Sequence, residues 1–433
     1  LQTDVAEKRG LLGGMLVRQG ADRSGKPGRF SPAVTVIILF GLISMLGDMV
    51  YESARSANSQ YFSLLGVTAA QVGLVFGIGE FLGYCLRLLA GLWSDKTGKQ
   101  WLFMFVGYGM LLVVPLMGFT RDWNWLVVLI LMERIGKALR NPAKDTVLSS
   151  VAQGQVGVGF AFGLQEALDQ AGAFLGPLIF TLVFTLSGAQ GAAQYQLSYK
   201  LLILPFLALM FFLYYSYRKV EGGRLIERMK VREFRSERLR GVFWRYTLFT
   251  LVCTAGFVNF STTGFHMKAS GLFTDREIPF IYALAMGVDA AAALLIGKAY
   301  DALKKRGGGN AGGLRVMAGI PLMTALLPFL TLSRSRWAVI TGMMLFGVVM
   351  GAHETVMRSA ISDLTPFSKR GTGYGVFNTA YGLALMLGAA VMGWLYGLNK
   401  VWLIQALVVL LEAGAGYLFL LLMRGAKEDE SPA

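Results

Sequence analysis

Long apolar stretches alternate with short polar segments along the 433 residues of this chain. A helix that crosses a membrane needs about 20 predominantly apolar residues, and twelve stretches are close to that length or longer. They cover residues 33–59, 69–93, 101–119, 125–139, 159–186, 197–217, 243–268, 279–300, 314–332, 337–357, 371–398 and 401–423. The pattern predicts an all-α integral membrane protein with twelve transmembrane helices in two sets of six.

The composition agrees with a membrane protein, because 55% of the residues are hydrophobic and only 15% are charged. The net charge of +15 does not indicate nucleic acid binding, since the Lys and Arg residues lie between apolar stretches rather than on one basic face. These residues gather in the leader, in the centre of the chain and in the loops after the second, fourth and eighth stretches. The positive-inside rule therefore predicts two cytoplasmic termini, in a bacterial inner membrane.

The same pattern predicts the domain organisation. We expect a cytoplasmic leader at 1–32, a six-helix bundle at 33–217, a basic cytoplasmic linker at 218–242, a second six-helix bundle at 243–423 and a cytoplasmic tail at 424–433. The leader lacks the compact apolar core of a cleavable signal peptide, so it is expected to stay attached. The linker either lies on anionic lipid headgroups or is a solvated connection that only fixes topology.

A short polar motif occurs once in each half of the chain. Residues 91–100 read GLWSDKTGKQ and residues 297–306 read GKAYDALKKR, each with a Gly four residues before an Asp and with basic residues after it. Each copy follows a long apolar stretch. Two halves that share a landmark are typical of transporters built by internal duplication.

The first copy resembles the signature G-x-L-x-D-x-x-G-[RK] of the major facilitator superfamily, with Gly91, Asp95, Gly98 and Lys99 in register and Trp93 in place of Leu. The second copy keeps Gly297 and Asp301 but continues as Ala302, Leu303 and Lys304 instead of the glycine region. The resemblance covers residues 33–423 and implies two pseudo-symmetric six-helix bundles that work by alternating access. It also implies that Asp95 locks the halves together by meeting a basic residue near the end of the fourth stretch, where Arg140 and Lys144 are candidates. Alternatively, Asp95 only caps its loop.

Two further segments resemble motifs of this superfamily. In the fifth stretch Gly172, Gly176 and Pro177 follow the G-x-x-x-G-P pattern associated with its exporters and antiporters, although the Gly pair that continues the motif is absent. The alternative is a plain helix-packing seam, because glycines permit close contact and proline permits a bend. In the fourth stretch Arg134 resembles the arginine linked to proton coupling.

Ionisable residues inside predicted membrane helices are costly and therefore indicate function. The candidates for proton coupling are Asp48, Glu52, Arg55, Glu80, Arg134, Glu166 and Asp169. The first three share one face of the first helix, since they are four and three residues apart. The alternative is a static cluster of ion pairs that fixes helix packing.

Polar residues in the more apolar second half are candidates for the substrate cavity. Together with one residue of the first helix they are Tyr51, Asn259, His266, Asp289, His353, Glu354, Asn378 and Tyr381. The two histidines are expected near opposite membrane faces, so no metal site that contains both is predicted. A local cation site at His353 and Glu354 is the alternative, and no cofactor is predicted.

The sequence contains no Walker loop, nucleophile elbow, zinc spacing or dinucleotide fingerprint attached to a soluble domain, so we predict that the protein is not an enzyme. The predicted function is secondary active transport, with proton-coupled antiport that exports a small organic or amphipathic solute. The expected partners are this solute, protons and membrane lipid, and a monomer suffices. Alternatives are uptake or facilitated transport of a polar metabolite, anion, siderophore or metal ion, and a non-transporting membrane sensor.

Overall fold

The computed structural model describes residues 32–152, 158–223, 241–304, 306, 309–365 and 370–430, and the secondary structure in these ranges is helical. The helices of the first half are α2 (Pro32–Leu64), α3 (Ala69–Thr97), α4 (Gln100–Gly109), η1 (Met110–Leu112), α5 (Val113–Leu116), η2 (Met117–Phe119), α6 (Trp123–Ala152), α7 (Val158–Ser187), α8 (Ala192–Leu201) and α9 (Ile203–Gly223). Those of the second half are α10 (Gly241–Gly256), α11 (Phe260–Ala269), α12 (Glu277–Leu303), α13 (Gly309–Leu314), η4 (Arg315–Gly319), α14 (Ile320–Thr331), α15 (Arg336–Leu364), α16 (Arg370–Gly397) and α17 (Val401–Glu430).

These helices confirm the predicted fold class of twelve membrane segments. Eleven segments of the described chain are long and apolar enough to cross a membrane. The twelfth is α6, whose first eighteen residues include Glu133, Arg134, Lys137 and Arg140. Helix α6 continues to Ala152, beyond the predicted end of the apolar stretch at residue 139, and Glu133, Arg134, Arg140 and Lys144 are buried.

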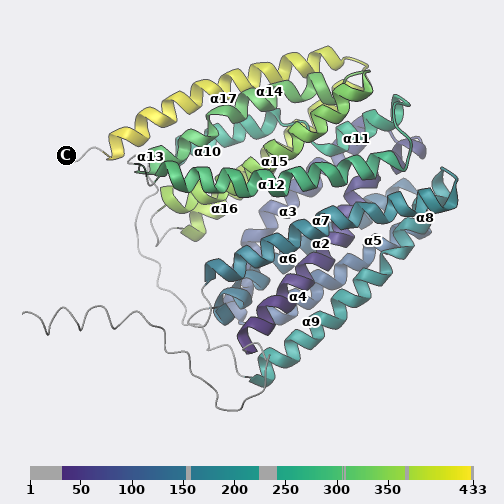
Figure 1. Ribbon diagram of the computed structural model, residues 1–433, viewed down its shortest axis with the longest axis horizontal. Coiled ribbons are helices and arrows are strands. Elements are labelled where there is room, and N and C mark those ends of the chain that lie inside the picture. The colour runs from purple at the N-terminus through teal and green to yellow at the C-terminus, as the bar shows by residue number, and fades with distance from the viewer. Residues whose placement is uncertain are drawn as a thin grey trace, which may run out of the picture.

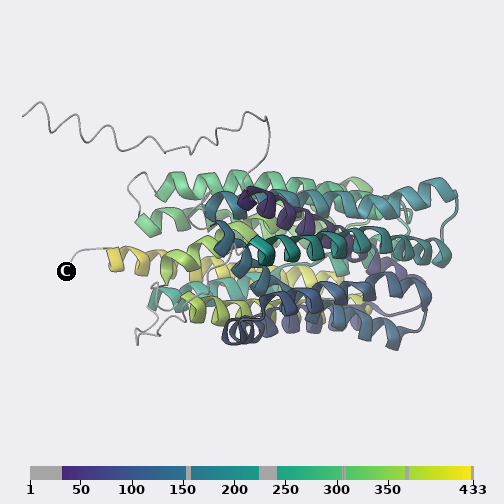
Figure 2. The same cartoon turned by 90° about the horizontal axis from the view of Figure 1, so that it is seen from below.

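The helices form two bundles whose long axes run in nearly the same direction (Figure 2). One bundle comprises α2–α9 and the other α10–α17 (Figure 1). Each has its own hydrophobic core of buried side chains. The start of α2 and the end of α17 lie at the same end of the molecule, which we call the termini end, and the opposite end is the loop end. The leader at 1–31 and most of the predicted linker lie outside the described residues.

The most extensive contacts between the bundles are those of α3 with α16 and of α7 with α12, and α2 also packs against α11. Small residues allow the first pair to pack backbone to backbone. A Cβ atom at Gly73 would lie 2.4 Å from the carbonyl oxygen of Ala389, and one at Gly393 would lie 2.6 Å from that of Ala69. The two pairs occupy equivalent positions in the two halves, as pseudo-symmetry requires.

The bundles meet closely at the loop end and diverge towards the termini end (Figure 1). At the loop end the Tyr195 hydroxyl donates to Asp275 Oδ1 of the other bundle at 2.9 Å. Lys268 Nζ forms an ion pair with the same oxygen at 2.5 Å. The buried Asp275 therefore ties the first bundle to the α11–α12 connection.

Candidate functional site

A cavity of about 730 Å³ lies between the bundles, and both of them contribute to its walls. Its lining residues are Tyr51, Glu52 and Arg55 of α2, Phe76, Glu80 and Tyr84 of α3, Arg134 and Lys137 of α6, Phe257, Asn259, Phe260 and Ser261 around the α10–α11 break, and Met350, Tyr381 and Leu385 of the later helices. Four of the seven proton-coupling candidates line this cavity, namely Glu52, Arg55, Glu80 and Arg134.

Helix α2 places Glu52 and Arg55 on the face that meets the cavity, because i and i+3 positions lie close together along a helix. Glu52 Oε1 accepts from Arg55 Nη1 at 3.4 Å. Its other oxygen, Oε2, accepts from the hydroxyl of Tyr282 at 2.6 Å. Since Tyr282 belongs to α12, this buried hydrogen bond connects the charged face of the first bundle to the second bundle.

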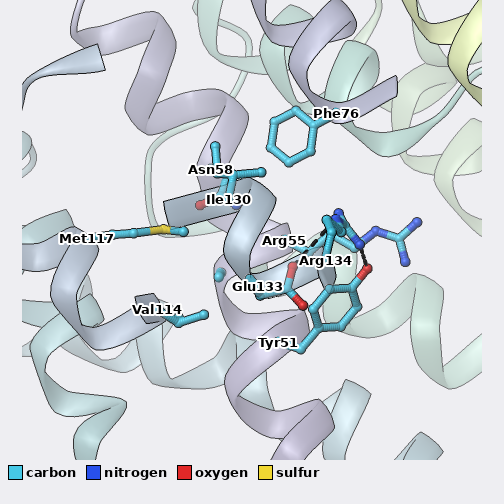
Figure 3. A pocket seen from close by; sticks show the side chains of 10 residues that line it. Tyr51, Arg55, Asn58, Phe76, Val114, Met117, Ile130, Glu133 and Arg134 are labelled. Carbon is cyan, nitrogen blue, oxygen red and sulfur yellow. Dashed lines mark hydrogen bonds and ion pairs between the residues drawn. The ribbon is translucent and has the colours of Figure 1, made fainter. Parts of the chain in front are cut away.

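Arg134 is the centre of the charge cluster on α6. Its Nη1 lies 3.1 Å from Glu80 Oε1 and its Nε lies 3.5 Å from Glu133 Oε2. The guanidinium also donates to the Tyr51 hydroxyl (Figure 3). Glu133 lies behind the arginine, in a smaller pocket of about 240 Å³, and its Oε1 is buried without a hydrogen-bond partner in the described structure.

Lys137 lies one helical turn from Arg134 and lines the same cavity. Its ammonium group sits 3.7 Å from the centre of the Tyr51 ring, a cation–π contact. Within the described part of the chain, it has no carboxylate within ion-pair distance. The sequence analysis did not select Lys137 or Tyr282, although the charged run Glu133–Lys137 on one helix was a usable signal for the lysine.

A second polar cluster lies between α2, α6 and α7. Lys144 Nζ donates to Ser44 Oγ at 2.6 Å and lies 3.8 Å from Asp169 Oδ2. Gln165 donates to the same Asp169 oxygen at 3.4 Å. Asp48 completes the cluster, with Asp169, Lys137, Glu52 and Lys144 as its charged neighbours. The nearby Glu166, another candidate, is exposed instead.

The second bundle contributes a broken helix to the cavity wall. Helix α10 ends at Gly256 and α11 begins at Phe260, where a single stretch was predicted. Asn259 caps α11, since its Oδ1 accepts from the backbone N–H of Thr262 at 3.3 Å. The N-terminus of α11 and the side chains of Asn259 and Ser261 therefore meet the cavity.

The other predicted substrate residues divide into three groups. Tyr51, Asn259 and Tyr381 line the cavity. His353 is buried behind it, 5.4 Å from Phe257 and 6.5 Å from Tyr381 between ring centres, and both of its ring nitrogens lack a hydrogen-bond partner in the described structure. The remainder lie elsewhere: Asp289 is buried where α12 crosses Gly351, Asn378 is half-buried on α16, and the side chain of Glu354 lies outside the described residues.

His266 is not among the residues that line this cavity, and it bonds to two residues at the loop end. One ring nitrogen lies 2.9 Å from the Tyr396 hydroxyl and the other lies 3.0 Å from the Ser333 carbonyl oxygen. Among the described residues, no group of three or more His, Cys, Asp or Glu side chains has the arrangement of a metal site.

The glycine motif at 91–99 has clear local structure. Gly91 packs against Pro142 of α6, and Gly98 ends α3 in the left-handed conformation, with φ of 65°. Lys99 is exposed at the start of α4. The side chains of Asp95 and Asp301 lie outside the described residues.

The two proposed basic partners of Asp95 are both buried within the first bundle. The Arg140 guanidinium lies 5.2 Å from the Tyr108 ring centre, and Lys144 belongs to the Asp169 cluster. Gly297, the counterpart of Gly91, packs against Thr355. The latch therefore stays a prediction, and in this state the two basic residues have other contacts.

The G-x-x-x-G-P motif forms the seam between α7 and α2. A Cβ atom at Gly172 would lie 2.2 Å from the Met45 carbonyl oxygen, and one at Gly176 would lie 2.4 Å from that of Met49. Pro177 lies within α7, one turn from where Phe174 meets Gly287 of the other bundle. The motif thus brings the polar residues of α7 and α2 together.

Comparison with known proteins identifies the family. Residues 33–314 and 272–433 match the Major Facilitator Superfamily. The chain belongs to this superfamily. It is therefore a membrane transporter of the major facilitator type, in agreement with its twelve helices and its cavity.

Several relatives and solved structures are similar to it. Uncharacterised proteins of Mycobacterium tuberculosis and Mycobacterium bovis are 33% identical over 380 residues, covering 86% of this chain and 90% of each relative. The multidrug resistance protein MdtG of a Rahnella species is 23% identical over 372 residues, covering 82% of this chain and 86% of MdtG. A bacterial homologue of the human lysosomal transporter Spinster has a TM-score of 0.69 at 15% identity, covering 94% of this chain and 100% of that one. The nucleoside transporter NupG has a TM-score of 0.63 at 14% identity, covering 90% and 98%.

Proposed function

We propose that this protein is a proton-coupled antiporter that exports a small organic or amphipathic solute by alternating access. The observation that carries the proposal is the cavity between the bundles. Its charged wall includes Glu52, whose carboxylate accepts a hydrogen bond from Tyr282 of the opposite bundle. A proton site beside a group that holds the two halves together can convert proton binding into movement. A static ion-pair cluster does not need this contact between the bundles.

The proton site in this proposal is the cluster of Asp48 and Asp169 around Lys144. Two neighbouring carboxylates repel one another when both are charged, and burial increases this repulsion. Asp169 is linked to the single ammonium at 3.8 Å, and its Oδ1 is buried without a hydrogen-bond partner in the described structure. We infer that one of the two carboxylates accepts the transported proton.

The proposed direction depends on topology. The predicted cytoplasmic position of the basic segments puts the termini end in the cytoplasm, so the described state is inward-facing, in an inner membrane. The two bundles, at 33–217 and 243–423, are then the bodies that rock about the α3–α16 and α7–α12 contacts. The name of MdtG as a multidrug resistance protein and the G-x-x-x-G-P seam support export. The Spinster homologue that shares the fold was solved in an inward-facing conformation.

The test is proton movement in proteoliposomes that contain the purified protein and an internal pH dye. An aromatic sulfonate, a quaternary ammonium dye and a nucleoside are added in turn under an imposed pH gradient. At least one probe is expected to cause proton flux, and Asp48→Asn and Asp169→Asn are expected to abolish it. Asp122→Asn is the matched control, because this exposed residue caps α6 through an oxygen that Asn retains. Normal proton flux in both cluster variants would remove the proposed proton site.

A further inference from the structure

The cavity carries an excess of positive groups that its own acids do not neutralise. Three cationic side chains line it, against two carboxylates. Arg134 pairs with Glu80 at 3.1 Å and Arg55 pairs with Glu52 at 3.4 Å. This leaves Lys137, whose ammonium lies 3.7 Å from the centre of the Tyr51 ring. Its acidic neighbour Asp48 does not line the cavity, and no described carboxylate lies within ion-pair distance of the ammonium. An ammonium in a cavity wall without a carboxylate partner favours a negatively charged ligand.

The acidic residue Glu133, next to Arg134 in the sequence, does not change the preference of the cavity for a negatively charged ligand. Glu133 is on the same helix, but it lines the smaller pocket (Figure 3) and is not among the residues that line the main cavity. Its Oε2 lies 3.5 Å from the Arg134 Nε. A ligand in the main cavity therefore meets the lysine directly.

The opposite wall also favours an anion. Asn259 and Ser261 place the N-terminus of the ten-residue helix α11 at the cavity. Asn259 caps the Thr262 N–H, whereas the Phe260 and Ser261 N–H groups precede the first bond within the helix. The positive end of a half-helix in a broken membrane segment is a common site for the anionic group of a transported molecule.

The remaining walls are apolar and mostly aromatic. Phe76, Tyr84, Phe257, Tyr381 and Leu385 lie around the charged groups. Such walls suit a flat apolar body rather than a small inorganic anion.

We propose that the cavity selects an organic anion, with its negative group between Lys137 and the N-terminus of α11 and its aromatic body against the surrounding rings. This inference rests on the proposed transport function and names its substrate class. One anion leaving and one proton entering would move two positive charges inward. An inside-negative membrane potential would therefore drive the exchange together with the pH gradient.

The experiment measures binding by calorimetry to the purified full-length protein. The probes share one aromatic body: 2-naphthalenesulfonate, 2-naphthalenesulfonamide and trimethyl(2-naphthyl)ammonium. The sulfonate is expected to bind at least tenfold more tightly than the other two. Lys137→Gln is expected to weaken sulfonate binding about tenfold and to leave sulfonamide binding unchanged, while Lys137→Arg restores sulfonate binding.

Lys200→Gln is the matched control. Lys200 also lies over an aromatic ring, at 4.6 Å from the centre of Phe119, but on α8 outside the cavity. Its replacement is expected to leave all three affinities unchanged. Equal affinity for the three probes, a preference for the ammonium probe, no binding of any probe, or unchanged sulfonate binding in Lys137→Gln overturns the inference.

The binding assay separates this inference from the proposed function, because it needs no proton movement. Selective sulfonate binding without any proton flux in proteoliposomes would sustain the anion site and refute proton-coupled transport. Proton flux with the ammonium probe but not with the sulfonate would sustain coupled transport and refute the anion site.

Discussion

The hydrogen bond between Tyr282 and Glu52 is expected to stabilise the described state, in which the bundles meet at the loop end. It joins a phenol to a carboxylate at 2.6 Å between α12 and α2, and both side chains are buried. Hydrogen bonds to charged groups contribute about 1.5–3 kcal/mol. Tyr282→Phe removes the donor, while Glu52 keeps Arg55 at its other oxygen.

The loss of this hydrogen bond shifts the equilibrium between the two access states about tenfold to a hundredfold towards the state that is open at the loop end. Each 1.4 kcal/mol changes an equilibrium constant about tenfold. The shift can be measured as the distance between spin labels at Ala189 and Lys400, which are exposed at the loop end of the two bundles. The native cysteines, Cys85 and Cys253, are first replaced by Ala. The long-distance population is expected to increase strongly in Tyr282→Phe.

Tyr199→Phe is the control for this measurement. Its hydroxyl also donates a buried hydrogen bond of 2.6 Å, to Asn58, but both residues belong to the first bundle. Removal of that bond is expected to lower thermal stability without changing the distance distribution. If Tyr282→Phe and Tyr199→Phe give the same distribution as the parent protein, the contact between the bundles does not control access.

Two other substitutions test the contacts between the bundles. Gly73→Ala is expected to destabilise the protein by about 1–3 kcal/mol, measured as a lower thermal unfolding temperature, because its Cβ would lie 2.4 Å from the Ala389 carbonyl oxygen. Gly416→Ala, where a Cβ meets nothing within 4 Å, is expected to leave stability equal or higher, and equal losses in both variants would contradict the close-contact argument. Asp95→Asn is expected to lower the turnover of 2-naphthalenesulfonate exchange more than its binding, and normal turnover in vesicles would argue against a latch.

The sequence predicted the membrane helices well because apolar length is a local property. It underestimated α6, since four charged residues within eight positions resembled the end of a span, whereas they face the interior of the protein. The break before Phe260 had a local signal in Gly256 and in Asn259, a good helix cap. Neither residue alone excludes an unbroken membrane helix, so the sequence did not predict the break.

Several of the charged residues selected in the first bundle, such as Glu52 and Arg134, are buried, yet their partners were not predictable. Tyr282 is 230 residues from Glu52, and nothing in the local pattern of α12 marks one tyrosine as a partner for a carboxylate. Lys144 likewise suggested a surface latch, because its burial against Asp169 depends on the close packing of α7 on α2. Pairings of this kind follow from packing between helices rather than from the sequence of one helix.

The positions of Asp48 and Glu52 on one helix suggest how a proton changes access. Four residues correspond to a rise of about 6 Å, and two like charges at that distance repel by about 3 kcal/mol at an effective dielectric constant near 20. This is comparable with the hydrogen bond that holds Glu52 to Tyr282. A proton on Asp48 removes the repulsion and so favours a charged Glu52, which accepts a stronger hydrogen bond from Tyr282. Because that bond between the bundles is lost when the loop end opens, the proton favours the described state. Proton release weakens it, as export requires before the loop end opens.

The direction in which protonation of Asp48 shifts the access equilibrium can be tested separately from proton flux. Asp48→Asn imitates the protonated residue, so the same spin labels are expected to report a smaller population open at the loop end, opposite to Tyr282→Phe. In the double variant the Asp48 substitution is expected to lose its effect, because the contact through which it acts is absent. An Asp48→Asn shift that persists in full without the Tyr282 hydroxyl would show that the proton acts on access by another route.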